Sequence, residues 1–186
     1  MPEDSFKIVD DVLAPNDKLI IEYRGPNPFK VYGALPKLMQ VIFHGRGKNV
    51  FEDKFKWDIT GDPRDFYFVF RWDDDKYDAY TKPTFSVLGL GKQPSDPNSP
   101  NGAIYMEIKG RVETEFKFKA AWQRAIAPSF IWAYLRLLYA PVRRRYLQIS
   151  KERLYKLSAA IRKEFGVTLE QPELGGADVR VSKLPM

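Results

Sequence analysis

Hydrophobic and polar residues alternate through much of residues 51–119, which is the period of two expected for antiparallel strands with one face in solvent. The longest alternation runs from Ile104 to Lys119 and exceeds the usual strand limit of about 10 residues. Gly110 lies at its centre on the apolar side, so we expect a bend or bulge there that lets the sheet curl.

Shorter segments with strand character lie on both sides of the first helical segment. Phe51, Asp53, Phe55, Trp57 and Ile59 alternate with polar residues, which predicts that they share one face of a strand. The remaining strands are expected at Phe6–Leu13, Lys18–Arg24, Phe66–Trp72, Tyr77–Lys82 and Thr84–Leu90.

A short helix is predicted between the early strands and the alternating segments. Apolar residues at helical spacing run from Val31 to Ile42, after Asn27 as a cap and before Gly45 as a stop. Pro36 is expected to shorten this helix or to break it in two.

A long helix is predicted at the C-terminal end, beginning near Pro128 and ending at Gly166. Pro141 should kink or divide it, since proline removes a backbone donor and clashes with the preceding turn. Beyond Pro141, an apolar stripe is formed by Leu147, Leu154, Leu157, Ile161 and Phe165.

These elements predict an α+β fold in which a curved antiparallel sheet packs on a long, proline-kinked C-terminal helix. Residues 1–166 are expected to form one domain, and residues 167–186 an irregular tail. The order of elements over about residues 18–166, with a bent long strand before the last helix, resembles the START-like helix-grip superfamily, which includes polyketide cyclases and lipid-transfer domains. The resemblance implies an apolar ligand between sheet and helix and no cofactor.

Composition narrows the classes of protein further. The chain of 186 residues has no cysteine, which excludes disulfides and thiolate chemistry and fits a reducing cytoplasm. Its N-terminus is polar, so no signal peptide is expected, and no apolar run reaches the roughly 20 residues of a membrane span. We expect a cytoplasmic protein that is able to lie on a membrane surface. Its many charged residues are typical of a protein from a thermophile.

Positive charge is concentrated near the C-terminal end. Residues 120–166 contain ten Lys and Arg and two Asp and Glu, a net +8 in a chain whose total is +6. A charged helix face is usually only solvated, but this one has few acids for pairing, so it predicts an acidic partner. That partner is either an external anion or Asp73–Asp75 of the same chain. The expected anion-binding residues are Arg143, Arg144, Arg145, Lys151 and Arg153.

Large aromatic side chains on the apolar face suggest a place for an apolar ligand. The expected lining residues are Phe55, Trp57, Phe68, Phe70, Trp72, Met106, Trp132 and Tyr134. Alternating aromatic residues are more often core than cavity, while the bulk of these rings argues for a cavity. The sequence leaves both interpretations open.

No catalytic or metal-binding constellation is found. His44 is the only histidine and has no nucleophile in a recognisable pattern, and the acidic groups around Asp58–Asp65 and Asp73–Asp75 lie at predicted turns. Asp53 lies within an apolar stretch, where burial would raise its pKa, but an exposed position at a wet strand end is favoured. If the protein catalyses a reaction, Asp53 and Tyr134 are the polar groups to which the sequence points.

The sequence therefore predicts a binding protein without enzymatic activity. An apolar, lipid-like molecule would lie between the sheet and the C-terminal helix, and the basic helix face would contact an anionic membrane surface. Two alternatives use the same helix: nucleic-acid binding without sequence preference, and packing in a homodimer.

Overall fold

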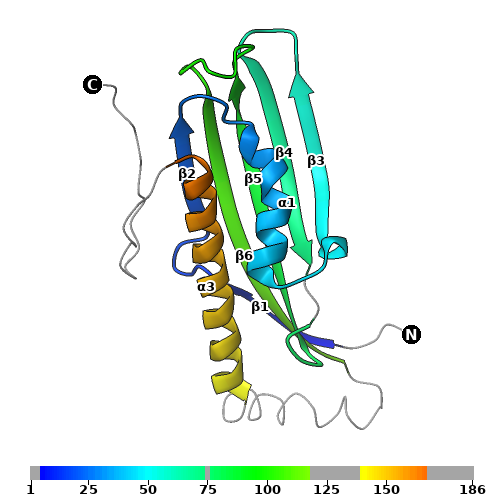
Figure 1. Ribbon diagram of the computed structural model, residues 1–186. Coiled ribbons are helices and arrows are strands. Elements are labelled where there is room, and N and C mark those ends of the chain that lie inside the picture. Colours follow the sequence, from blue (N-terminus) through cyan, green and yellow to red (C-terminus); the bar gives the residue numbers. More distant parts are fainter. Residues whose placement is uncertain (1–4, 74–75, 118–138, 167–186) are drawn as a thin grey trace.

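The computed structural model describes residues 5–73, 76–117 and 139–166. These residues form a six-stranded antiparallel sheet with α-helices on one side, so the predicted α+β class is confirmed (Figure 1). The strands are β1 (Ser5–Asp11), β2 (Leu19–Arg24), β3 (Val50–Asp58), β4 (Arg64–Asp73), β5 (Thr81–Gln93) and β6 (Ala103–Lys117). The helices are α1 (Lys30–Phe43), the 3-10 helix Gly47–Asn49 and α3 (Ala140–Glu164).

Strand β6, with 15 residues, organises the sheet. The strand order is β1-β6-β5-β4-β3, and β2 also pairs with β6. Strand β1 pairs with the second half of β6 and β2 with its first half, so two short strands share one edge of a long one. Between them, the amide of Val12 donates to the carbonyl of Gly110 at 3.0 Å.

Gly110 has a different role from the one predicted. The pairing of β5 with β6 passes through Phe85 and Gly110 without a shift of register, so the expected bulge is not there. A Cβ atom at Gly110 would lie 2.6 Å from Cδ1 of Leu154 on α3 and 3.0 Å from Cδ1 of Phe85. The glycine lets the helix lie directly on the sheet.

A register shift occurs instead in β3, between Glu52 and Lys54. Because the shift inserts one residue, Phe51 lies opposite Arg71 while Phe55 lies opposite Phe68. The prediction that Phe51 and Phe55 share a face is therefore wrong.

Asp53 is exposed at the β3 register shift, as the favoured interpretation of the sequence had it. One of its carboxylate oxygens lies 3.0 Å from Nε of Arg71 on β4. Its charge is therefore met by an ion pair at the surface.

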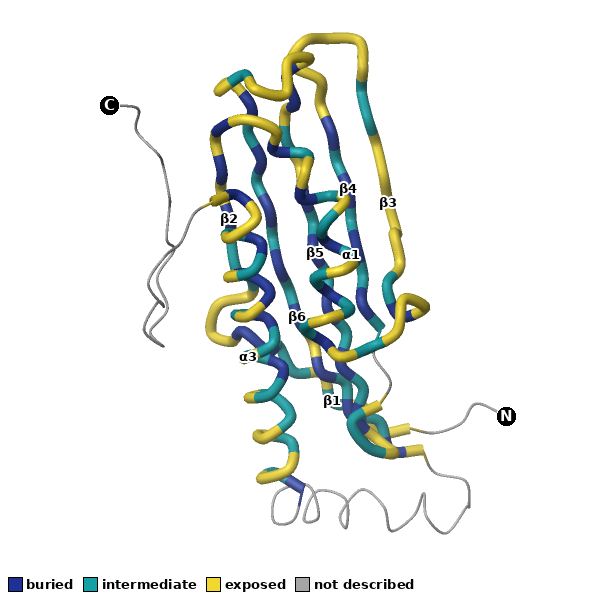
Figure 2. The backbone as a smooth tube through the Cα atoms, viewed as in Figure 1, coloured by how far each residue is buried: buried dark blue, intermediate teal, exposed yellow. Residues whose placement is uncertain are grey.

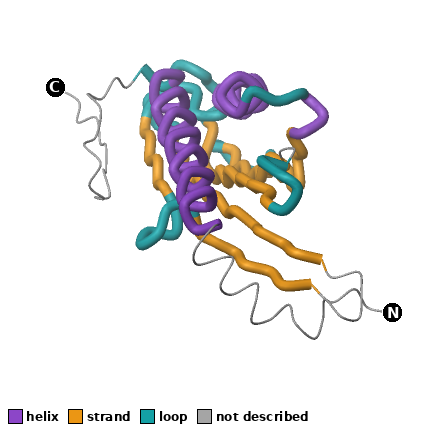
Figure 3. The backbone as a smooth tube through the Cα atoms, turned by 90° about the horizontal axis from the view of Figure 1, so that it is seen from below, coloured by secondary structure: helices purple, strands orange, loops and turns teal. Residues whose placement is uncertain are grey.

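Within the described part of the chain, two helices, not one, cover the inner face of the sheet (Figure 3). Helix α1 contacts β3 and β4, α3 contacts β6 and β2, and the helices contact each other. The sequence predicted packing of the sheet on the C-terminal helix, and α1 lies on the same face beside it. Helix α1 is continuous through Pro36, so the predicted break is wrong. Its buried residues, Val31, Leu35, Met39 and Phe43, hold it on the sheet.

Helix α3 begins at Ala140, so Pro141 lies in its first turn, where the missing amide donor costs nothing. The predicted kink is not seen within the described helix, and the predicted start near Pro128 lies outside the described residues, as does the tail at 167–186. The predicted apolar stripe is largely confirmed: Leu154, Leu157, Ile161 and Phe165 are buried, and Leu147 is partly buried.

The core beneath α1 is a close aromatic layer. The ring of Phe43 stacks on that of Phe85 with centroids 4.5 Å apart and lies 5.2 Å from that of Trp72. On β5, a Cβ atom at Gly89 would lie less than 3 Å from three atoms of the Phe68 ring. The ring of Phe68 therefore lies flat against the backbone of the neighbouring strand.

Candidate functional site

Half of the residues expected to line a ligand cavity belong to the packed core. Phe68, Phe70, Trp72 and Met106 are buried on the inner face of the sheet (Figure 2). The indole Nε1 of Trp72 is buried and has no hydrogen-bond partner among the described residues. The rings of Phe70 and Tyr32 of α1 have centroids 5.4 Å apart, so the helix fills the space above this part of the sheet.

Phe55 and Trp57 lie instead at the edge of the sheet, where β3 is mostly exposed (Figure 2). Together with Phe29 and Tyr32 they form a group of rings that we call the aromatic patch. The centroid of Phe29 lies 4.2 Å from that of Trp57, and the centroid of Tyr32 lies 5.0 Å from that of Phe55. Phe55 is 46% exposed and the other three are half-buried, so solvent reaches this patch.

The phenol of Tyr32 fixes one side of the aromatic patch. It donates a hydrogen bond of 2.9 Å to Oε2 of Glu52. Burial and this carboxylate both raise the pKa of Tyr32, so its hydroxyl remains protonated at neutral pH. The patch thus offers aromatic surface with one polar pair at its margin. The last two expected lining residues, Trp132 and Tyr134, lie outside the described residues.

The expected anion-binding residues do not act alike. Arg143 forms a two-pronged ion pair with Asp10 of β1, joining the first turn of α3 to the sheet. The guanidinium of Arg153 lies over the ring of Tyr77, 5.5 Å from its centroid, and donates to its hydroxyl at 3.3 Å. These two arginines anchor the helix.

Of the other cations of α3, Arg144, Arg145, Lys156 and Lys163 are exposed, whereas Lys151 and Arg162 are half-buried and burial lowers the pKa of Arg162. Within 5–73, 76–117 and 139–166, no ion pair is formed by Arg144, Arg145, Lys151, Lys156, Arg162 or Lys163. At about 100° per residue these six positions fall within an arc of roughly 140° on the helix. We call this arc the basic face. It lies opposite the buried stripe of Leu154, Leu157 and Ile161.

Asp73, expected as an internal partner for these charges, is occupied elsewhere. Its carboxylate lies 2.6 Å from Nη1 of Arg71 and 3.9 Å from Nζ of Lys82. The expectation that Asp73 neutralises the helix is therefore wrong, and Asp74 and Asp75 lie outside the described residues.

A buried polar network holds the start of α3. The hydroxyl of Tyr139 donates to Oδ2 of Asp78 at 2.6 Å and is also hydrogen-bonded to Thr81. Burial alone would raise the pKa of Asp78, but hydrogen bonds from Tyr139 and from the amides of Tyr80 and Thr81 outweigh it and lower the pKa. Burial and the Asp78 carboxylate raise the pKa of Tyr139. No sequence pattern predicted this network, because Tyr139 is distant in sequence from Asp78 and Thr81.

The outer face of the sheet carries a separate charged cluster. Glu107 on β6 accepts hydrogen bonds from Lys18 at 2.7 Å and from Tyr105 at 2.9 Å. The bond from Lys18 is the main cause that lowers the pKa of Glu107 to about 2. This cluster stabilises the junction of β2 and β6 and is remote from both helices.

No protein-family model and no curated protein matches this chain. Function therefore rests on the geometry of the chain itself. His44 is the residue that ends α1, has a left-handed backbone conformation and is exposed. In the part of the chain that the structure describes, no three His, Cys, Asp or Glu side chains converge as metal ligands would. None of the helices in that part is long and apolar enough to cross a membrane.

Proposed function

We propose that this protein is a non-enzymatic binding protein that contacts an anionic lipid surface through the basic face of α3 and holds an apolar molecule at the aromatic patch. The observation that carries the first part is the set of six cations on one side of α3, four of them exposed, that form no ion pair among the described residues. Helix α3 carries eight cations and two acids, so its net charge of +6 equals that of the whole chain.

Positive charge without acidic partners destabilises the free protein and favours its binding to an anionic surface. The six cations repel one another along one side of the helix, and only Glu152 shares that side. Near an anionic bilayer each Lys or Arg contributes about 1 kcal/mol, so several acting together give stable but salt-sensitive attachment.

Exposed apolar residues near the first turn of α3 favour a lipid surface over a nucleic acid. Val142 is 37% exposed in that turn. The ion pair between Arg143 and Asp10 brings β1 to the same end, where Phe6 and Val9 are also exposed. A bilayer interface accommodates apolar side chains beside cations, whereas a phosphate backbone offers them little.

Cosedimentation with phosphatidylcholine vesicles, with and without phosphatidylserine, tests this proposal. The variant Arg144→Gln/Arg145→Gln/Lys156→Gln removes three charges from the basic face, which should weaken binding about 100-fold at 1 kcal/mol per charge. The control Lys37→Gln/Lys48→Gln/Lys54→Gln removes the same charge from exposed positions elsewhere and should bind nearly as the wild type does.

Equal weakening by both triple variants would contradict a specific basic face. No binding to phosphatidylserine vesicles, together with steeply salt-dependent retention on DNA or RNA, would replace the lipid surface with the nucleic-acid alternative. A dimer that dissociates in the basic-face variant would favour the homodimer alternative.

The apolar ligand is supported by the open rings of the aromatic patch, and not by the packed core around Phe68 and Trp72. A ligand here would lie between α1 and β3, away from α3, and would contact Phe55 and Trp57. The curved sheet and C-terminal helix support the helix-grip resemblance, but a ligand at the aromatic patch departs from the place between sheet and C-terminal helix that the resemblance implies.

Strand β3 supplies a matched pair of variants for the ligand. Phe55 and Phe51 are exposed to a similar degree, 46% and 42%, but face opposite sides of the sheet. Native mass spectrometry after incubation with a lipid extract should show a bound apolar molecule in the wild type and in Phe51→Ala, and a reduced amount in Phe55→Ala. No bound molecule in the wild type, or equal loss in both variants, would remove the ligand from the proposal.

A further inference from the structure

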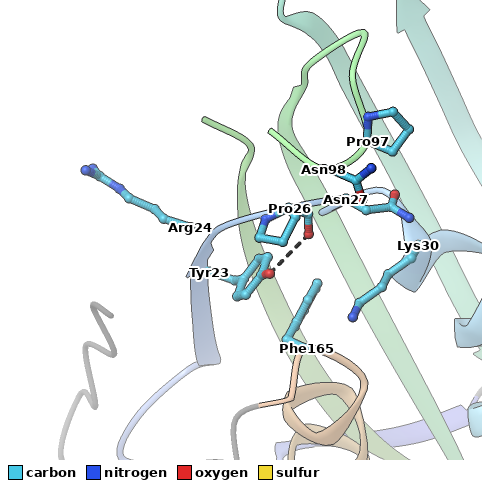
Figure 4. A pocket seen from close by; sticks show the side chains of 8 residues that line it. All are labelled: Tyr23, Arg24, Pro26, Asn27, Lys30, Pro97, Asn98 and Phe165. Carbon is cyan, nitrogen blue, oxygen red and sulfur yellow. Dashed lines mark hydrogen bonds between the residues drawn. The ribbon is translucent and has the colours of Figure 1, made fainter. Parts of the chain in front are cut away.

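A pocket opens at the end of the molecule opposite the start of α3. It lies where β2 ends, α1 begins and α3 ends, beside the connection between β5 and β6 (Figure 4). Its volume is about 420 Å³, within the range of sites that bind small molecules. It shares no residue with the basic face or with the aromatic patch.

The described residues give the pocket a positive charge. Its lining residues in that part of the chain include Lys30 and Arg24 and no carboxylate. Lys30 extends over the ring of Phe165 with Nζ 5.7 Å from the centroid, whereas Arg24 extends away from the other lining side chains (Figure 4). Neither cation forms an ion pair within the described residues, so the Lys30 ammonium is left for a ligand.

A rigid aromatic floor lies beneath this ammonium. The rings of Tyr23 and Phe165 are stacked with centroids 4.3 Å apart, and both residues are buried. The hydroxyl of Tyr23 donates to the carbonyl of Pro26 at 3.1 Å, which fixes the ring. The two stacked rings therefore support each other at the base of the pocket.

Further groups in the pocket also suit an anion. The side-chain amides of Asn27 and Asn98 are part of the lining and can donate hydrogen bonds. Helix α1 begins at Lys30 without a side-chain cap and without an acid in its first turn. Oε1 of Gln93 accepts a hydrogen bond from the amide of Phe29 just before the helix, and the positive end of the helix dipole lies beside the pocket.

We propose that this pocket binds a small phosphate monoester whose apolar body is about the size of one ring. The phosphate contacts the Lys30 ammonium and the two amides, and the apolar body lies on the floor formed by Phe165 and Tyr23. A phosphate suits the site because its three oxygens accept several hydrogen bonds at once. The ligand is either a free metabolite or a lipid headgroup with this chemistry.

Titration with phenyl phosphate, followed by amide shifts in two-dimensional NMR spectra, tests the pocket. We expect saturable shifts in residues 26–30 and around Asn98. Lys30→Gln should weaken binding about tenfold, since a hydrogen bond to a charged group contributes roughly 1.5–3 kcal/mol. Arg24→Gln removes the same charge from a side chain that points away, and should weaken binding less than about twofold by the same scale.

Equal weakening by Lys30→Gln and Arg24→Gln would overturn the proposal, because it would show only a general effect of charge. The absence of saturable shifts in the wild type would overturn it as well. Vesicles containing phosphatidic acid distinguish the two sources: if Lys30→Gln weakens vesicle binding too, the ligand is a headgroup, and if not, it is a free metabolite. The pocket is separate from the basic face of α3. Lys156→Gln should therefore leave phenyl phosphate binding unchanged.

Discussion

Replacing Gly89 by alanine tests whether the aromatic layer under α1 is solid or leaves room for a guest. The added Cβ would lie 2.6 Å from Cε2 and 2.7 Å from Cε1 of the Phe68 ring. Cζ of the ring would lie closer still, so the ring would have to move by more than about an ångström to restore an ordinary carbon contact. It is fully buried and also contacts Tyr32 and Phe70, with centroids 5.5 and 5.7 Å away, so it has little freedom to move.

Overpacking of this kind costs about 1–3 kcal/mol of unfolding free energy. For a chain of this size each kcal/mol lowers Tm by roughly 2–4 °C, so thermal unfolding of Gly89→Ala should occur about 2–12 °C below the wild type. Gly33→Ala is the matched control. Gly33 lies inside α1 with nothing within 4 Å of an added Cβ, so alanine should stabilise the helix by up to about 1 kcal/mol.

A double variant identifies the clash as the cause. Gly89→Ala combined with Phe68→Leu should lose less stability than the sum of the two single changes, because the smaller side chain makes room for the methyl group. An unchanged or higher Tm for Gly89→Ala would refute the reasoning. It would mean that the Phe68 ring has free space around it, as a cavity for an apolar molecule would provide.

Two further predictions concern titratable groups. The pKa of Glu107 is about 2 in the folded protein, below its ordinary value of 4.5, so its ion pair with Lys18 stabilises the fold fully above pH 4.5 and is lost as the pH falls toward 2. Glu107→Gln should lower the free energy of unfolding at pH 7 by about 1 kcal/mol, measured by urea unfolding. It should also reduce the loss of stability between pH 4.5 and 2. An unaltered pH profile would contradict the role given to the ion pair of Glu107 with Lys18. Tyr139→Phe removes the donor to Asp78 and should cost about 1–3 kcal/mol in the same assay, while a neutral result would show that water replaces the phenol.

The sequence predicted the elements better than their contacts. Alternation located most of the β-strands, because side chains in a strand point to opposite faces, but the two strands predicted at Tyr77–Lys82 and Thr84–Leu90 are replaced by the single strand β5. In β3 a single inserted residue was enough to upset the alternation. With the register shift at Asp53, Phe51 faces away from Phe55, and no local pattern indicated this shift. Pro36 led to a wrong prediction of a helix break. The low helix propensity of proline favours a break, but the packing of α1 on the sheet outweighs it.

The candidate sites were predictable only where one element carries the whole feature. The basic character of α3 follows from composition, and its outward direction follows from the apolar stripe beginning at Leu147. Arg143 and Arg153 differ from the other cations because they contact Asp10 and Tyr77, which are remote from them in sequence. The pocket at Lys30 likewise forms only where α1, β2 and the end of α3 come together in space, and a periodic pattern in the sequence cannot predict such contacts.

The chain contains no cysteine, so a single introduced cysteine can carry a nitroxide label at one chosen position. With the label at Lys156→Cys, on the basic face of α3, electron paramagnetic resonance should show reduced mobility and reduced collision with a water-soluble relaxation agent when phosphatidylserine vesicles are added. The same label at Lys54→Cys, on exposed β3, should report no change. Equal changes at both positions, or none at Lys156→Cys, would contradict the account that α3 presents its charges to an anionic surface.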